Sequence, residues 1–166
     1  MAAKSDTIVK FGSLEPGSYD YRFKLGDDFF ADYENEKIHG GDVLFEVKMD
    51  KKSHSLMFHF DFNGTVETEC DRCLGAMSVE VSGKESLYVE FGDEAVDTQR
   101  EDMTILRKDE TKIDLAQWMY EYVAVAMPMQ CLHAEGQCDP EVTKYLVNDE
   151  AGKPADTRWA ALEALR

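Results

Sequence analysis

The longest regular pattern in the chain is an alternation of apolar and polar side chains between residues 42 and 92. Successive side chains of a β-strand point to opposite faces, so this period of two predicts strands with one buried face. The clearest run places Phe58, Phe60 and Phe62 on one face, with polar residues between them. The pattern therefore indicates a fold built on an antiparallel sheet.

Turn signals divide this region into strands. A polar turn at 50–53 precedes the run of phenylalanines, and Asn63-Gly64 is a dipeptide typical of tight hairpin turns. Two earlier runs, 7–11 and 19–25, are rich in β-branched and aromatic residues and flank a Glu-Pro-Gly turn sequence. We expect these two runs to form a first pair of strands.

Further strand patterns follow at 77–81, 86–91 and 103–106, the last after an acidic stretch that we interpret as a loop. Residues 26–41 interleave acids with aromatic residues and suit a short helix or a loop. Together the strand patterns predict an antiparallel sheet that is partly closed into a barrel.

The hydrophobic period changes near residue 115. Apolar residues then recur at helical spacing, at Leu115, Trp118, Met119, Tyr122, Val123 and Ala126. This stripe predicts an amphipathic helix that packs on the sheet. Asp114 is placed to cap the helix, Gln117 completes a capping box, and Pro128 ends it.

Two more helices are predicted toward the C-terminus. One has Asp139 as its N-cap and Pro140 at its first position, and the other begins at Asp156. On the second of these, three apolar residues share one face that needs a partner: Trp159, Leu162 and Leu165. The predicted fold class is α+β in a single domain over residues 1–166, mainly β to residue 110 and mainly α from 111.

Four cysteines are grouped in two places. Cys70 and Cys73 form a C-x-x-C pair at the end of a predicted strand, and Cys131 and Cys138 follow the amphipathic helix, with His133 between them. A zinc site needs four thiolate or imidazole donors, which proteins usually offer from two short loops. The second loop offers either Cys131 with Cys138 or His133 with Cys138, and the sequence pattern leaves both open.

Two other interpretations of the cysteines stand beside zinc. A C-x-x-C pair also serves thiol-disulfide chemistry, although redox pairs lie at helix N-termini and this pair is flanked by strands and acids. The four residues also suit buried thiols with no special role, or oxidative pairing of Cys131 with Cys138. No serine-hydrolase, phosphate-loop or HExxH motif is present, and no small-molecule substrate is indicated, so we expect a non-enzyme.

The net charge of −16 bears on partners. Nucleic-acid affinity rests on Lys and Arg that neutralise phosphates, so this charge favours a basic protein partner over bare RNA. The first residues lack the apolar stretch of a secretion signal, and no run is long enough to span a membrane. We therefore expect a cytoplasmic protein whose cysteines stay reduced.

Three stretches resemble the YceD-like family, the large ribosomal RNA subunit accumulation proteins. The sequence CDRCL at 70–74 is similar to the family's C-x-R-C-L signature, residues 113–130 resemble its helix ending in a proline, and 156–165 resemble the D-P-R-W ending of one branch. The second cysteine group departs from the longer G-L-C-x-x-C-G run of many relatives.

The resemblance implies a role in ribosome biogenesis, in the accumulation of large-subunit ribosomal RNA, without known catalysis. It also implies binding to components of the large subunit, which suits an acidic protein that binds a basic ribosomal protein. In the branch with the tryptophan ending, an H-x-E-G-x-C pattern favours His133 and Cys138 as partners of Cys70 and Cys73, with Cys131 as the alternative fourth ligand. The other functions considered are a redox protein using Cys70 and Cys73, and a zinc-stapled scaffold module.

Overall fold

The computed structural model of the protein describes residues 7–33, 35–92 and 103–146. Its strands are β1 (Ile8–Lys10), β2 (Gly17–Leu25), β3 (Gly40–Lys51), β4 (Ser55–Glu69), β5 (Ala76–Gly92), β6 (Met103–Arg107) and β7 (Lys112–Asp114). Its helices are α1 (Asp27–Ala31), α2 (Ala116–Ala126) and α3 (Pro140–Thr143). None of these helices is long and apolar enough to cross a membrane.

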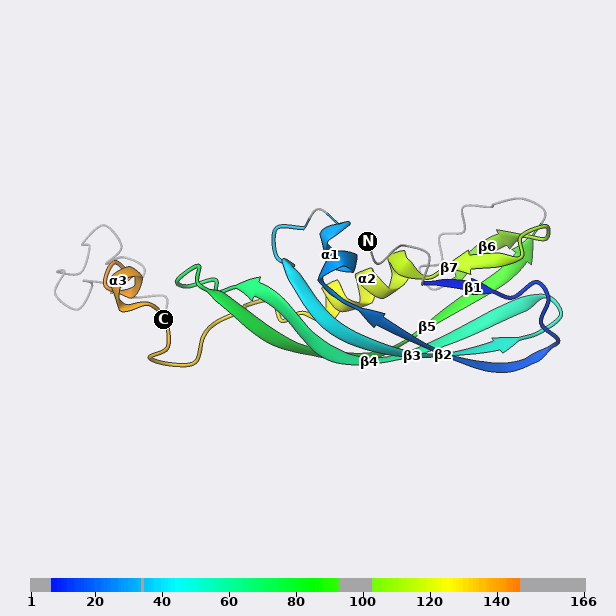
Figure 1. The fold of residues 1–166 in the computed structure, drawn as a ribbon, viewed down its shortest axis with the longest axis horizontal. Helices are drawn as coiled ribbons and strands as arrows, with labels where there is room; N and C mark the ends of the chain where they lie inside the picture. Colours follow the sequence, from blue (N-terminus) through cyan, green and yellow to red (C-terminus); the bar gives the residue numbers. More distant parts are fainter. Residues whose placement is uncertain (1–6, 34, 93–102, 147–166) are drawn as a thin grey trace, which may run out of the picture.

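Five strands form one long, curved sheet in the order β2-β3-β4-β5-β6 (Figure 1). The first four pair antiparallel with their chain neighbours, and β6 pairs parallel to β5. The mixed α+β class is confirmed, but the predicted partial barrel is wrong. Closure requires the first and last strands to pair, whereas within the described residues β2 and β6 remain the two edges of an open sheet.

One face of the sheet carries the core. The small β1–β7 sheet, α1 and α2 all lie over this face (Figure 1). Its largest fully buried side chains are Leu25, Phe45, Met49, Leu56, Phe58, Phe60 and Phe62 from the sheet, with Phe30, Leu115 and Met119 from the covering elements. The predicted alternation of buried and exposed residues on β3 and β4 is thus confirmed.

The predicted turn at Asn63-Gly64 is wrong, because β4 continues through both residues. Asn63 pairs with Leu44 and Gly64 with Val43 in the ladder between β3 and β4. A Cβ atom at Gly64 would lie 2.2 Å from the carbonyl oxygen of Asp42. The glycine therefore permits a close backbone approach within the sheet. The sequence Asn-Gly looks the same whether its glycine serves a turn or such a close approach. Similarly, the two strands expected at 77–81 and 86–91 are one strand, β5.

The first two strands do not pair with each other. β1 pairs antiparallel with β7, which lies more than a hundred residues away in the chain, while β2 pairs with β3. The side-chain hydroxyl of Thr7 donates to Asp114 Oδ1 at 2.6 Å beside this small sheet. This pairing places the start of the described chain against the entry to α2.

The amphipathic helix α2 forms where the apolar period predicted it. Leu115 occupies the N-cap position, and Asp114 lies one residue earlier, where its Oδ1 accepts the N–H of Ala116 at 3.0 Å. Gln117 bonds Glu121 instead of closing a capping box. Met127 adopts an extended conformation before Pro128, so the predicted end of the helix is confirmed.

The next predicted helix is α3, where Asp139 is the N-cap and accepts the N–H of Glu141 at 2.8 Å. It is shorter than predicted. Most of the acidic loop predicted at 92–110, namely residues 93–102, lies outside the described residues, and so does the helix predicted from Asp156.

Candidate metal centre

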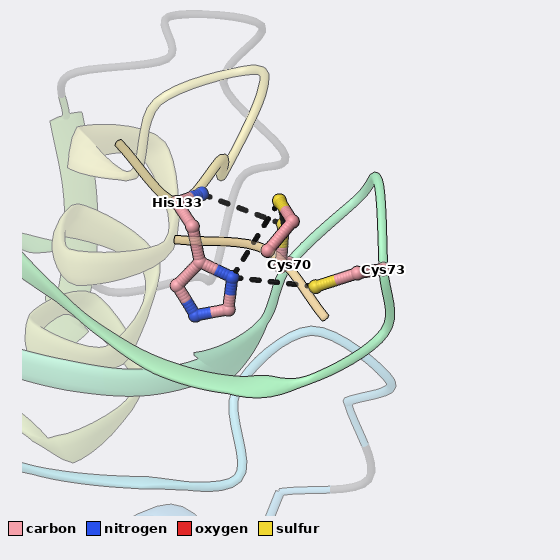
Figure 2. A group of neighbouring side chains, drawn as sticks. Cys70, Cys73 and His133 are labelled. Atoms are coloured by element: carbon pink, nitrogen blue, oxygen red, sulfur yellow. Dashed lines mark hydrogen bonds between the residues drawn. The ribbon is translucent and has the colours of Figure 1, made fainter. Parts of the chain in front are cut away.

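Four side chains from three segments converge at the end of the sheet. Cys70 and Cys73 lie in the connection between β4 and β5, His133 lies in the loop after α2, and Cys138 directly precedes α3. One ligand atom from each residue lies within 4.8 Å of all the others. Both Cys70 and Cys73 are buried, and the His133 ring faces them (Figure 2).

The C-x-x-C loop is shaped by its own backbone. The N–H of Cys70 donates to the carbonyl of Gly75 at 2.9 Å, and the N–H of Leu74 donates to the carbonyl of Cys70 at 2.8 Å. Leu74 has a positive φ of 56°, in the left-handed region that non-glycine residues seldom adopt. This tight turn directs the sulfur atoms of Cys70 and Cys73 to the same side of the loop (Figure 2).

Asp71 fastens the second loop to the first. Its backbone N–H donates to the carbonyl of Cys131 at 2.7 Å, and its Oδ2 accepts the N–H of Cys131 at 2.7 Å. Its other carboxylate oxygen bonds Lys37. The hydrogen bond from Lys37, and then that from Cys131, lower the pKa of Asp71 and keep it ionised.

Cys131 does not join the cluster. Its thiol is buried, but its Sγ lies beside the carbonyl oxygen of Pro128 at 3.9 Å. Of the two predicted ligand sets, the structure therefore brings together the one with Cys70, Cys73, His133 and Cys138 and leaves Cys131 apart.

Backbone donors surround the sulfur of Cys70. The N–H groups of His133 and Arg72 point at this atom from 3.4 Å and 3.5 Å. Burial by itself would raise the pKa of the Cys70 thiol, but these donors and that of Cys73 lower it to about 6. Cys70 is therefore poised to carry the negative charge of a thiolate.

The pKa values of Cys73 and Cys138, the other two cysteines of the cluster, shift in opposite directions. The backbone N–H of Asp139, followed by that of Gly75, lowers the pKa of Cys73. Burial raises the pKa of Cys138, and the neighbouring sulfur atoms raise it further. Arg72 Nη1 lies 3.9 Å from Cys138 Sγ. This guanidinium places a positive charge beside a site that would hold three thiolates.

His133 is oriented through both ring nitrogens. Its Nδ1 lies 3.3 Å from Cys73 Sγ (Figure 2). The same atom is 3.9 Å from Cys138 Sγ, while Nε2 lies 3.3 Å from the carbonyl oxygen of Ala76. When the proton is on Nε2, that N–H donates to the Ala76 carbonyl, and the lone pair of Nδ1 is directed toward the sulfur atoms of the cluster. Metal-binding histidines are commonly oriented in this way by a backbone carbonyl.

The donor set fits zinc. Three sulfurs and one imidazole nitrogen form one of the common structural zinc sets, and zinc–sulfur bonds of about 2.3 Å in a tetrahedron separate the sulfurs by about 3.8 Å. Cys70 Sγ and Cys138 Sγ are 3.9 Å apart. A disulfide would need about 2.0 Å, so the same distance does not suit a covalent pair. All four cysteines are free thiols.

Asp71 and Lys37 were not predicted as part of the site. Asp71 stands inside the C-x-x-C motif, but its hydrogen bonds reach a residue sixty positions away, and no local spacing reveals such a contact. Lys37 comes from the segment between α1 and β3. The sequence signal for Asp71 was its position between Cys70 and Cys73, since a residue between two residues of a site must lie close to that site. Lys37 had no such signal.

Fold and site together define a small α+β protein with a Cys3His cluster at one end of an open sheet. Residues 58–166 match the family described as large ribosomal RNA subunit accumulation protein YceD, and the chain belongs to this family, as its motifs predicted. The family's name implies a role in the accumulation of large-subunit ribosomal RNA. The matched range contains all four residues of the cluster. Searches of curated proteins and of solved structures found no match.

Proposed function

We propose that the protein is a non-enzymatic factor in ribosome biogenesis that binds a basic ribosomal protein of the large subunit. The observation that carries the proposal is the family match, which covers the Cys3His cluster. In this proposal the protein acts in the cytoplasm during assembly of the subunit and supports accumulation of the ribosomal RNA through its protein partner.

The cluster has a structural part in this proposal. Cys70, Cys73, His133 and Cys138 would hold the zinc ion, which supplies a cross-link between the end of the sheet and the loop that leads to α3. Four protein donors complete a tetrahedral shell and leave no position for a substrate, which is the pattern of structural sites. The chain's own hydrogen bonds between Asp71 and Cys131 align the two loops.

The charge of the surface supports a basic partner. The uncovered face of the sheet near the cluster carries three exposed acids, Asp42, Glu67 and Glu80, on neighbouring strands. The charge of Asp42 is offset by its ion pair with Lys24 at 2.9 Å, so the negative charge of this region comes mainly from Glu67 and Glu80, within an overall charge of −16. Such a field attracts Lys- and Arg-rich protein segments and repels phosphates.

Depletion of the protein tests the cellular role. The expected result is a lowered ratio of large-subunit to small-subunit ribosomal RNA, restored by the wild-type gene and not by a Cys70→Ser, Cys138→Ser double variant. An unchanged ratio, and an unchanged subunit profile on sucrose gradients, would contradict the role.

A binding experiment tests the partner class. Tagged protein is mixed with purified large-subunit ribosomal proteins and, separately, with the protein-free ribosomal RNA at moderate salt. We expect retention of a basic ribosomal protein and none of the RNA. A Glu67→Lys, Glu80→Lys variant should lose the protein, and retention of RNA alone would overturn the proposed partner.

The low pKa of Cys70 is the observation that favours thiol-disulfide exchange as a second function. Against it, the Cys70 side chain is fully buried, and the turn at 70–75 starts no helix. Treatment with oxidised glutathione separates the two functions. If the cluster holds zinc, the metal-loaded protein should form no mixed disulfide with glutathione. If the protein is a redox protein, glutathione should rapidly modify Cys70, and Cys73 should then release it by forming a disulfide with Cys70.

A further inference from the structure

An apolar hollow lies beside the metal centre. It has a volume of about 400 Å³ and lies between the end of α2, the segment after it, and the segment before β3. Its lining includes Ile38, Ala124, Val125, Met127 and Met129. Its polar lining residues are Asn35, Lys37 and Asp71, and Asp71 is bonded to Cys131, which also lines the hollow.

The apolar side chains around this hollow are unusually exposed. Val125 is 82% exposed on the last turn of α2, and Met129 is fully exposed just after the helix. Leu132, next to Cys131, adds a further exposed apolar residue. Single exposed apolar residues are common, but a group that borders a hollow is typical of a surface that another segment covers.

The chain itself has a segment suited to cover it. Trp159, Leu162 and Leu165 recur every three residues near the C-terminus, and such spacing places them on one face of a helix. The described chain ends at Leu146, soon after Cys138 of the metal centre. The residues from Leu146 to Trp159 can extend over about 40 Å, so the segment can reach the hollow.

Tethering favours this occupant over a separate molecule. A segment joined by a short linker has an effective concentration in the millimolar range at its docking site, without any added contact. The segment 156–166 contains two acids and two arginines, so its side chains carry no net charge. The acidic surface of the protein therefore repels this segment less than it would repel an acidic protein. A second copy of this protein would bring its own charge of −16.

We propose that residues 156–166 dock in the hollow bordered by Val125 and Met129, with Trp159 as the buried anchor. The docked segment covers the apolar end of α2 and lies against the loop held by Asp71 and Cys131. The proposal does not depend on the ribosomal role, since it concerns how the chain covers its own surface.

The chain contains two tryptophans, so a Trp118→Phe variant leaves Trp159 as the sole reporter. We expect a blue-shifted emission and an acrylamide quenching constant several-fold below that of a peptide with the sequence of residues 150–166. Adding Val125→Glu and Met129→Glu should shift the emission to the red and raise the quenching constant at least about twofold, because charges desolvate poorly in an apolar contact. Leu44→Glu, on the uncovered face of the sheet, is the matched control and should change neither value.

Circular dichroism verifies that each variant folds. We expect the glutamate variants to fold because Val125 and Met129 are exposed and contribute little to the core. Quenching of Trp159 equal to that of the peptide would overturn the proposal, and so would an unchanged signal after the two glutamate substitutions. Protection of Trp159 that disappears on hundredfold dilution would also overturn it, in favour of docking between two copies.

Discussion

Which side chain completes the cluster with Cys70, Cys73 and Cys138 is determined at the scale of single residues. Sequence spacing placed Cys131 and His133 on the same short loop and did not choose between them. In the structure the backbone N–H of Cys131 bonds Asp71 and its Sγ lies beside the carbonyl oxygen of Pro128, while His133 faces the other residues of the cluster. The bond between Cys131 and Asp71 joins segments that are sixty residues apart, and the sequence pattern does not reveal such a contact.

This difference between two nearby cysteines gives a direct prediction. Cys138→Ser should abolish stoichiometric zinc and lower the free energy of unfolding by several kcal/mol, since metal binding contributes to folding. Cys131→Ser, at an equally buried thiol outside the cluster, should retain one zinc per chain. Elemental analysis of protein purified without added metal measures the zinc, and equal zinc content in the two variants would contradict the assignment.

Arg72 gives a second prediction at this scale. Its guanidinium lies 3.9 Å from Cys138 Sγ, where it offsets the negative charge that three thiolates bring to a zinc ion. Arg72→Gln should weaken zinc affinity about tenfold, the lower end of the effect of residues that contact metal ligands. Competition with a chromophoric chelator measures the affinity. Lys84→Gln, on the uncovered face of the sheet, controls for net charge and should leave the affinity unchanged.

At the scale of secondary structure, hydrophobic period was a reliable guide and turn dipeptides were not. The alternation on β3 and β4 and the helical stripe of α2 were predicted from the sequence, because burial on one face imposes those periods. Asn63-Gly64 misled because glycine serves two purposes, a left-handed turn and close backbone contact, and both leave the same sequence signal.

Substitution of Gly64 separates these two purposes. A Cβ atom at Gly64 would lie 2.2 Å from the Asp42 oxygen and 2.6 Å from Val43 Cα, both backbone atoms that cannot rotate away. Gly64→Ala should therefore destabilise the protein by at least about 2 kcal/mol. Gly17→Ala, where the nearest atoms belong to the Tyr19 ring at 3.9 Å, should change stability by less than about 0.5 kcal/mol. Urea denaturation measures both, and equal effects would exclude the close approach as the reason for Gly64.

At the scale of the whole molecule, the sequence predicted the elements better than their partners. The class of the fold follows from the periods, but the pairing of β1 with β7 and the open sheet depend on contacts between distant segments. These contacts are set by how the covering elements fill one face of the sheet. The same holds for the candidate metal centre, whose four side chains were predicted as two groups and meet because α2 ends beside the connection between β4 and β5.

Two separate buried clusters lie within the described residues, and this separation predicts how the protein responds to metal removal. The large core lies between the sheet and its covering elements, whereas Cys70, Cys73 and Cys138 form a small cluster with Met77 and Val142. If the small cluster holds the proposed zinc ion, removal of the metal takes away that cross-link, but the apolar contacts of the large core remain. Hydrogen exchange with and without a chelator should therefore show faster exchange at 70–75 and 131–138, with unchanged protection at the centres of β3 and β4. Loss of protection throughout the sheet would show that the two clusters unfold together.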